Sequence, residues 1–358
     1  MVQVIPASED EQDFLEAESA ILPAWLAAAL VCPTCKKPVE AARAAWTCHS
    51  CNRTYPVRFG VPDFRLNPDP YISIDDEVRK IEKLFAGPRK SFEQLLAAYY
   101  ELSPENPPVL NRHYVTAMQA AVTRGRALLS RIRSNFPSAP AETLLDLGCG
   151  TGGLLVSAPD FYPRFVGADV ALRWLLIGRQ RLLQADLDVP LICCNAEFLP
   201  FAPGTFSAVT GDAVLEHVSD VERTRDETLR VLAPGGSFFF VTNNRYSILP
   251  EPHLRIPAFG LLPRRMMEAV AMTLRKTPYK ARLMSVRELG RIFRSSAKVT
   301  LPSYGEGELG PAAEPMRRRY AAFSKWSLAR KVLWPVVPQY FISGSKAETP
   351  IGRLSSIA

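Results

Sequence analysis

The chain has 358 residues, of which 47% are apolar and 22% charged, and its formal net charge is +7. This apolar content supplies a globular core and excludes a chain too polar to fold. The basic balance favours anionic partners such as RNA, phosphorylated metabolites or a membrane surface, without choosing among them.

Residues 1–30 begin as an acidic tail, at the place where a secretion signal would carry basic residues. The sequence therefore predicts a cytoplasmic protein. No apolar run approaches the roughly 20 residues needed to span a bilayer. Apolar residues at helical spacing, Ile21 and Trp25 among them, predict an amphipathic helix that straps onto the rest of the chain.

Four of the seven cysteines form two CxxC pairs within residues 31–65, with twelve residues between the pairs. Two such turns bring four thiolates into the near-tetrahedral arrangement of Zn²⁺ and leave no position for a catalytic water, so the predicted metal is structural. Cysteines that only pack are the alternative. His49, inside the second pair, is a spacer or an alternative ligand. The predicted ligands are Cys32, Cys35, Cys48 and Cys51.

Prolines interrupt residues 65–110 around a predicted helix at 91–103. A long amphipathic helix is expected over 111–134, because apolar residues there recur at helical spacing.

Residues 143–153, TLLDLGCGTGG, are an apolar run that leads into a glycine-rich turn. Glycine tolerates positive φ and lets a ligand lie directly on the backbone, and a strand leading through such a turn to a helix is a nucleotide site. A second predicted strand ends at Asp169, twenty-one residues after Gly148. In dinucleotide folds a carboxylate meets the ribose at a spacing of about 20 residues.

Predicted strands alternate with helices of about ten to fifteen residues between residues 143 and 242. This alternation is typical of an α/β fold, in which helices cover both faces of a parallel sheet and ligands bind at the carboxyl ends of the strands. Cys193 and Cys194, in the third strand, are expected to pack in the core. The expected strands are 143–147, 164–169, 190–194, 206–210, 237–242, 298–301 and 339–345.

The last third of the chain is expected to carry the specificity. Residues 243–265 hold too many prolines and glycines for a regular element and predict a structured substrate loop. Ser285 opens a predicted helix with a capping box. Two basic amphipathic segments, 262–276 and 317–334, are expected to form a lid over the pocket. Contact with a membrane surface and contact with phosphate or RNA are the alternatives.

The segment DLGCGTGG resembles motif I of the class I S-adenosylmethionine-dependent methyltransferases. Three later segments resemble the same family in order: NAEFLPF at 195–201, FSAVTGDAVLEHV at 206–218 and VLAPGG at 231–236. The likeness is strongest for the type 11 domains and covers about residues 110–346. It implies a seven-stranded Rossmann-like methyltransferase sheet with helices on both faces, S-adenosyl-L-methionine as cofactor, and methyl transfer.

The resemblance also implies roles for single residues. Asp146 and the glycine turn would cradle the methionyl end of the cofactor, and Asp169 would accept both ribose hydroxyls. Asn195 would meet the adenine, although Asp is commoner there in the family. Tyr114 belongs to a helix that packs over the cofactor, with plain core packing as the alternative. The expected cofactor-binding residues are Asp146, Gly148, Gly150, Gly152, Asp169, Val170, Asn195, Ala196, Glu197, Asp212 and Tyr114.

Transfer of an activated methyl group requires an aligned nucleophile and, for oxygen or nitrogen acceptors, a base. His253, on the substrate loop, is the first candidate for that base or for binding an anionic group. His217, in LEHV, lies beside the transferred methyl in the family. A structural role is the alternative for both. The candidate catalytic residues are His253, His217, His113 and Tyr246.

The cysteine segment ends in YPVRFGVPDF and resembles the zinc ribbons that accompany some methyltransferases. We therefore expect four parts: an N-terminal helical strap at 1–30, a zinc ribbon at 31–65, a helical linker with cofactor-covering helices at 66–135, and a methyltransferase domain at 136–358. The methyltransferase domain is expected to contain lid insertions at about 244–284 and 303–336.

The predicted function is transfer of a methyl group by in-line displacement to a small lipophilic or phosphorylated acceptor, since apolar lids favour a closed pocket. A ribosomal RNA methyltransferase is the first alternative, because a ribbon on this domain resembles the bacterial guanine methyltransferases. No N/D-P-P-Y/F motif follows the fourth strand, however. An inactive scaffold is the second alternative, and the intact glycines and Asp169 speak against it.

Overall fold

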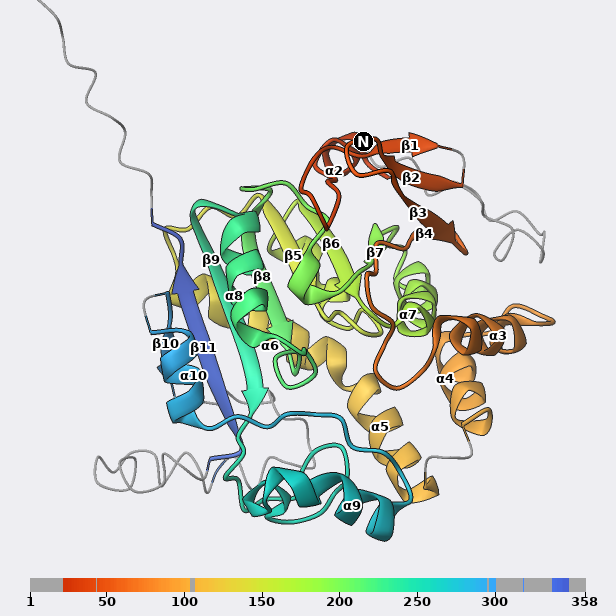
Figure 1. The fold of residues 1–358 in the computed structure, drawn as a ribbon, viewed down its shortest axis with the longest axis vertical. Coiled ribbons are helices and arrows are strands. Elements are labelled where there is room, and N and C mark those ends of the chain that lie inside the picture. The colour runs from red at the N-terminus through yellow and green to blue at the C-terminus, as the bar shows by residue number, and fades with distance from the viewer. Residues whose placement is uncertain are drawn as a thin grey trace, which may run out of the picture.

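The computed structural model describes residues 22–42, 44–103, 107–294, 296–300, 318 and 337–347. These residues form a four-stranded sheet, β1-β2-β3-β4, and a seven-stranded sheet in the order β10-β11-β9-β8-β5-β6-β7. The small sheet lies beside the β7 edge of the large one (Figure 1). No helix within these ranges is long and apolar enough to cross a bilayer.

The large sheet is parallel from β7 to β9, and β11 runs antiparallel to both of its neighbours. The chain order reverses at β5, which pairs with β6 on one side and with β8 on the other. A crevice for ligands is expected at such a reversal. The strands are β5 Thr143–Leu147, β6 Arg164–Asp169, β7 Leu191–Cys193, β8 Phe206–Asp212, β9 Leu232–Asn243, β10 Lys298–Thr300 and β11 Gln339–Ser345.

Helices cover both faces of this sheet because successive strand residues point to opposite sides. Leu145 and Val209 belong to the cluster that includes Val221 of α8. Their neighbours Leu144 and Ala208 belong to the cluster built on α6. The helices are α2 Ala24–Ala27, α3 Ile74–Phe85, α4 Phe92–Glu101, α5 Pro108–Gln119, α6 Ala121–Asn135, α7 Leu172–Gln184, α8 Val221–Val231, α9 Arg264–Arg275 and α10 Val286–Ile292.

The α/β fold and its parallel sheet are confirmed, and so is the capping box at Ser285. Cys193 and Cys194 are buried, as expected for packing residues. The lid segment 303–336 and the N-terminal strap before residue 22 fall outside the described residues, apart from Arg318.

Two helix predictions are wrong. The expected single helix over 111–134 is two helices that meet at Ala120, where Ala121 packs so closely that a Cβ on Gly153 would lie 2.4 Å from its own. The chain therefore bends around the glycine turn. After β5 the expected helix of about ten to fifteen residues is only the 3₁₀ turn Leu155–Asp160, which contains Pro159. Proline removes a helical hydrogen bond and clashes with the preceding turn.

The ribbon consists of β1 Glu40–Ala42, β2 Ala45–Cys48, β3 Arg53–Arg58 and β4 Val61–Pro62, paired antiparallel. It docks on the large sheet through backbone bonds. The Val31 N–H donates to the Pro200 carbonyl at 2.9 Å, and the Phe64 N–H donates to the Cys193 carbonyl at 2.7 Å. The chain that leaves the ribbon is therefore joined to the end of β7, and the chain that enters it is joined to the segment between β7 and β8.

Two helical glycines offer a matched test of packing. A Cβ on Gly178 of α7 would lie 2.8 Å from the Thr151 backbone, whereas a Cβ on Gly290 of α10 would meet nothing within 4 Å. We expect Gly178→Ala to lower the free energy of unfolding by about 1–3 kcal/mol through overpacking. Gly290→Ala should raise it by up to about 1 kcal/mol through helix propensity. Urea denaturation measures both, and a Gly178→Ala protein as stable as the parent would contradict the packing described.

Candidate cofactor site and histidine pair

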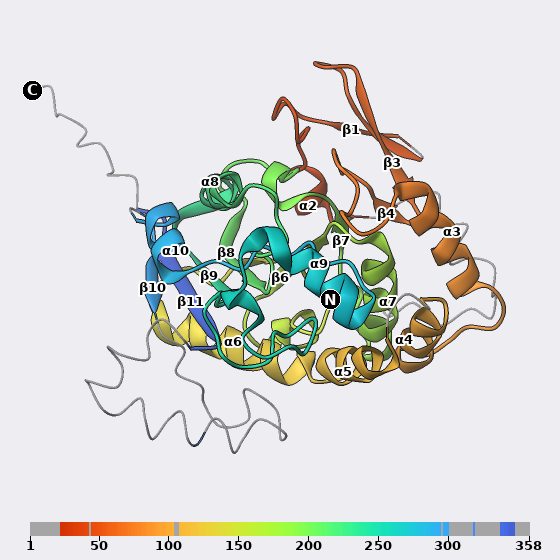
Figure 2. The ribbon, with the colours of Figure 1, turned by 60° about the horizontal axis from the view of Figure 1, so that its bottom comes forward.

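A cavity of about 260 Å³ lies at the carboxyl ends of β5 and β8, beneath α5 and α6. Figures 1 and 2 show α5 and α9 beyond this end of the sheet. Strand ends, the glycine turn and the covering helices all contribute to its lining. Lining residues include Tyr114, Met118, Arg124, Asp146, Gly148, Gly150, Thr151, Trp174 and Asp212.

The glycine turn leaves its backbone open to this cavity. Gly148, Gly150 and Gly152 have φ of 69°, 50° and 69°, in the region that favours glycine. A Cβ on Gly148 would lie 2.3 Å from Val214, so no side chain fits there. A Cβ on Gly150 would meet nothing within 4 Å. A ligand can therefore approach the backbone at Gly150.

The carboxylate of Asp169 joins the ends of β5 and β6. One oxygen accepts the Gly150 N–H at 2.8 Å, and the other accepts the Ala171 N–H at 2.8 Å. Burial raises the pKa of Asp169, and the two N–H donors act against that rise. Each carboxylate oxygen has a second lone pair, so this group can also accept hydrogen bonds from a ligand.

Two carboxylates, Asp146 and Asp212, line the cavity, whereas Asp169 is not among its lining residues and meets it through Gly150. Burial raises the pKa of Asp146 well above its ordinary value, and the charges of Asp212 and Asp169 raise it further. Asp212 forms an ion pair at 3.7 Å with Arg124. A cationic ligand would be stabilised by these neighbouring acids. The acidic lining and the open glycine backbone thus fit a positively charged nucleoside such as S-adenosylmethionine.

Tyr114 lines the cavity and also ties α5 to the substrate loop. Its hydroxyl donates to the His253 carbonyl at 2.6 Å, and its ring stacks on Tyr100 with centroids 6.0 Å apart. The neighbouring His113 bonds to the Pro252 carbonyl at 2.9 Å. Both residues therefore position residues 252–253, and His113 is engaged with the backbone of the loop.

Two residues expected at the adenine end, Asn195 and Glu197, form hydrogen bonds with other parts of the chain. The Asn195 side-chain oxygen accepts the Leu66 and Asn67 N–H groups at 2.9 and 3.1 Å, and its amide donates to the Asn67 carbonyl at 3.1 Å. Its amide is thus occupied by the chain that leaves the ribbon. Glu197 also has another role, since it accepts hydrogen bonds from the backbone and hydroxyl of Ser219.

The remaining residues of the adenine segment lie close by. Ala196 begins a buried 3₁₀ turn. The carbonyl of Val170 accepts a hydrogen bond at 3.0 Å from Arg65, a residue that the sequence analysis missed. Arg65 lies two residues after Asp63 at the end of the ribbon, and an acid–arginine pair in an otherwise apolar segment is the signal that could have found it.

His253, in the loop over 243–265, meets His217, which follows β8, with their Nε2 atoms 3.1 Å apart. Behind them, Glu251 bonds to the His253 Nδ1 at 2.6 Å and accepts the Tyr279 hydroxyl at 3.2 Å. Three groups thus form a chain: Glu251, His253 and His217. The fourth catalytic candidate, Tyr246, lies at the surface and is 38% exposed, with its ring facing Arg245.

The two histidines have opposite pKa shifts. Burial lowers the pKa of His217 to about 3. Burial also acts to lower the pKa of His253, but the charge and hydrogen bond of Glu251 raise it above its ordinary value of 6.5. Burial therefore favours the neutral form of His217, whereas the contact with Glu251 favours the protonated form of His253.

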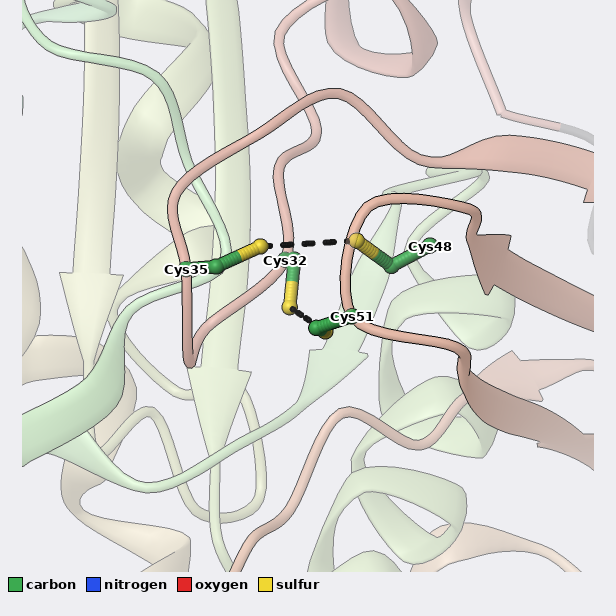
Figure 3. Close-up of side chains that lie close together, drawn as sticks. All are labelled: Cys32, Cys35, Cys48 and Cys51. Carbon is green, nitrogen blue, oxygen red and sulfur yellow. Dashed lines mark hydrogen bonds between the residues drawn. The ribbon is translucent and has the colours of Figure 1, made fainter.

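The four cysteine sulfurs of the ribbon lie within 4.8 Å of one another (Figure 3). The Cys32 Sγ lies 3.5 Å from the Cys51 Sγ, and the Cys35 Sγ lies 3.5 Å from the Cys48 Sγ. Zinc–sulfur bonds of about 2.3 Å in a tetrahedron separate the sulfurs by slightly less than 4 Å. The cluster fits such an ion. His49 bonds instead to Glu40, with a side chain that is 73% exposed, as expected for a spacer.

Part of the chain matches a known protein family. Residues 145–240 match the family described as "Methyltransferase domain". This part of the chain is therefore similar to methyltransferase domains. The match covers the glycine turn, the Asp169 strand and the strands as far as β9.

The curated relatives that the chain resembles are also named as methyltransferases. The chain is 38% identical over 104 residues to the demethylmenaquinone methyltransferase of Symbiobacterium thermophilum, covering 28% of this chain and 41% of that enzyme. It is 36% identical over 131 residues to the Thermus thermophilus enzyme of the same name, covering 36% and 56%. The ubiquinone biosynthesis O-methyltransferase of Brucella anthropi is 33% identical over 113 residues, covering 30% and 46%. The chain thus spans about half the length of these relatives.

Among solved structures, the YcgJ protein of Bacillus subtilis is 18% identical, with a TM-score of 0.40 over 62% of this chain and 98% of its own. A likeness this distant bears on no single residue of the chain.

The Glu251–His253 contact predicts a measurable titration. His253 should titrate above 6.5 in the parent protein, and Glu251→Gln should lower its pKa because the carboxylate charge is lost. A raised folded-state pKa stabilises the protein at pH values below 6.5, and this contribution disappears as the pH rises through the folded-state pKa. NMR of the imidazole carbons measures the pKa. Glu268→Gln, at an exposed residue paired with Lys280, is the control and should leave it unchanged. An unshifted His253 in Glu251→Gln would contradict the contact.

Proposed function

We propose that this protein is an S-adenosylmethionine-dependent methyltransferase that acts on a small lipophilic acceptor of the quinone type. The observation that carries the proposal is the junction of Gly150 and Asp169 at an acidic cavity. The matched methyltransferase domain supports the reaction. The acceptor class follows the relatives, whose names refer to demethylmenaquinone and ubiquinone.

In this proposal the described residues divide the cofactor between them. Asp169 accepts hydrogen bonds from the ribose hydroxyls, and the open backbone at Gly150 allows close approach. Asp146 and Asp212 stabilise the cationic methionyl end. Gly148 and Gly152 shape the turn through their positive φ. When bound, the cofactor supplies a methyl group that is already activated on a sulfonium.

The histidine pair is proposed as the base for the acceptor. Glu251 orients His253 and stabilises its charged form, and His217 contacts the Nε2 on the other side of the His253 ring. A hydroxyl acceptor that reaches the Nε2 of neutral His253 can pass its proton to that nitrogen as the oxygen attacks the methyl group in line, and Glu251 stabilises the imidazolium that forms. Tyr114 and His113 hold residues 252–253 in place from α5 and thereby link the base to the roof of the cavity.

The surface of the substrate segment suits a lipophilic acceptor. Eight large apolar side chains stand out as exposed in the described part of the chain, and six of them lie between residues 246 and 274. They flank the loop that carries His253. We propose that the acceptor reaches the histidine pair from this side. The six are Tyr246, Ile248, Leu261, Met266, Met272 and Leu274.

We further propose that the ribbon binds one structural Zn²⁺ through its four cysteines. The thiolate set is complete without water, which supports a structural and not a catalytic ion.

The cofactor assignment is tested at Asp169. Removal of a charged acceptor costs about 1.5–3 kcal/mol, so Asp169→Ala should weaken binding of S-adenosylhomocysteine roughly 10- to 150-fold. Calorimetry on the full chain measures the affinity. Asp226→Ala, at a side chain that is 64% exposed on α8, is the matched control and should bind like the parent. Equal affinities for Asp169→Ala and the parent would mean that the ribose lies elsewhere.

A further inference from the structure

We propose that residues 63–67, the exit segment by which the chain leaves the ribbon, form the adenine-side wall of the cofactor site. Metal bound in the ribbon therefore raises the affinity of the methyltransferase domain for its cofactor. This inference rests on the proposed function. Three sets of contacts support it. They are packing between the metal ligands and the exit segment, hydrogen bonds from the exit segment to the Asn195 side chain, and a buried ion-pair network beside Asp169.

The exit segment is anchored to the metal ligands through aromatic packing. The Tyr55 hydroxyl lies 3.1 Å from the Cys32 sulfur, and the Tyr55 ring lies 4.9 Å from the ring of Phe64. Phe64 is fully buried and also packs near Trp46, at 6.3 Å. The position of Phe64 thus depends on the fold that the four cysteines close.

From Phe64 the exit segment adds to the large sheet. Asp63 forms a parallel bridge with Cys193 of β7, and the Phe64 N–H donates to the Cys193 carbonyl. Beyond Arg65, the backbone of Leu66 and Asn67 binds the Asn195 side chain through three hydrogen bonds. Asn195 stands where the resemblance places the adenine contact. The exit segment therefore lies against the carboxyl end of β7, where adenine is expected.

A buried network fixes the exit segment to the strand end that carries Asp169. Arg65 pairs with Asp63 at 2.7 Å and with Glu77 at 2.6 Å, and it donates to the carbonyl of Val170, the residue after Asp169. Arg173 of α7 completes the network. It pairs with Glu77 at 2.7 Å and with Asp69 at 2.8 Å.

These five side chains, from three separate segments, are each 7% exposed or less. Burial alone would lower the pKa of Arg65, but contact with Asp63 raises it above its ordinary value. Buried charges that lose a partner are strongly destabilising. The network consequently links the exit segment to β6 and α7 through Arg65, in the folded ribbon that the structure shows.

Without metal the four cysteines no longer close the ribbon, because binding energy at such a site is folding energy. Tyr55 and Phe64 then lose their support, and the exit segment loosens from Val170 and from Asn195. Both contacts flank the ribose carboxylate. The cofactor site keeps its glycine turn but loses its wall at the adenine end, so affinity falls.

The experiment uses the full chain and three readouts: zinc content by mass spectrometry, S-adenosylhomocysteine affinity by calorimetry, and hydrogen exchange of residues 63–71. Cys48→Ser should lose the metal, bind at least about ten-fold more weakly and exchange faster in this segment. His49→Ala, which alters the exposed spacer of the same turn, should match the parent in all three. A metal-free Cys48→Ser protein with parental affinity would overturn the inference.

A second variant leaves the ribbon intact. Asn195→Asp removes the donor to the Asn67 carbonyl and sets a carboxylate against it, so we expect about a ten-fold loss of affinity with full zinc content. If Asn195 instead contacts adenine directly, Asp at this position should bind as well as Asn or better, and that result would also overturn the inference. Asn67→Ala is the control, since it keeps all three backbone contacts. A parent protein that fails to bind S-adenosylhomocysteine would instead reject the proposed function.

Discussion

The hydrogen bond from the Gly150 N–H to the Asp169 carboxylate is the contact on which the proposed site depends. It joins the ends of two neighbouring parallel strands, β5 and β6, at the point where the order of the sheet reverses. The chain turns here with positive φ at three glycines, and that turn exposes backbone to the cavity. A side chain at Gly148 would collide with Val214. The cradle is therefore a consequence of backbone geometry, and the surrounding side chains supply its charge.

Charge distribution separates the two ends of this site. At the end proposed for the methionyl group, Asp146 and Asp212 line the cavity and Arg124 is the one basic residue among the described residues that line it, an arrangement that suits a cation. At the adenine end, carboxylates and guanidinium groups pair with one another in a buried network. The first end therefore suits a cationic ligand, whereas the paired charges at the second end hold residues 63–67 against the domain. The ribbon thus contacts the large sheet and α7 through its exit segment.

Local patterns in the sequence were sufficient to predict the sheet and the glycine turn. Strand β5, the turn and Asp169 lie within 27 residues of one another, and each has a signature in residue type and spacing. The break at Ala120 was not predictable in this way, since it follows from close packing against Gly153 on another element. The role of Pro159 was visible in the sequence and was overlooked.

The contacts that decide the candidate site are long-range. Asn195 is held by residues nearly 130 positions earlier, and His217 meets His253 across 36 positions. Periodicity contains no information on such pairs. The sequence singled out both histidines, but only the fold shows that Glu251 lies behind them and that Tyr114 and His113 bind the same loop. Their catalytic roles, and those of the cofactor residues, stay predictions.

A crystal structure of the full chain with S-adenosylhomocysteine tests the central claim most directly. The account predicts the ribose hydroxyls at Asp169, the sulfur in the cavity beneath α5 and α6, and the adenine beside residues 64–67 with the Asn195 bonds intact. A ligand bound elsewhere, or an adenine ring that displaces the exit segment from Asn195, would contradict it.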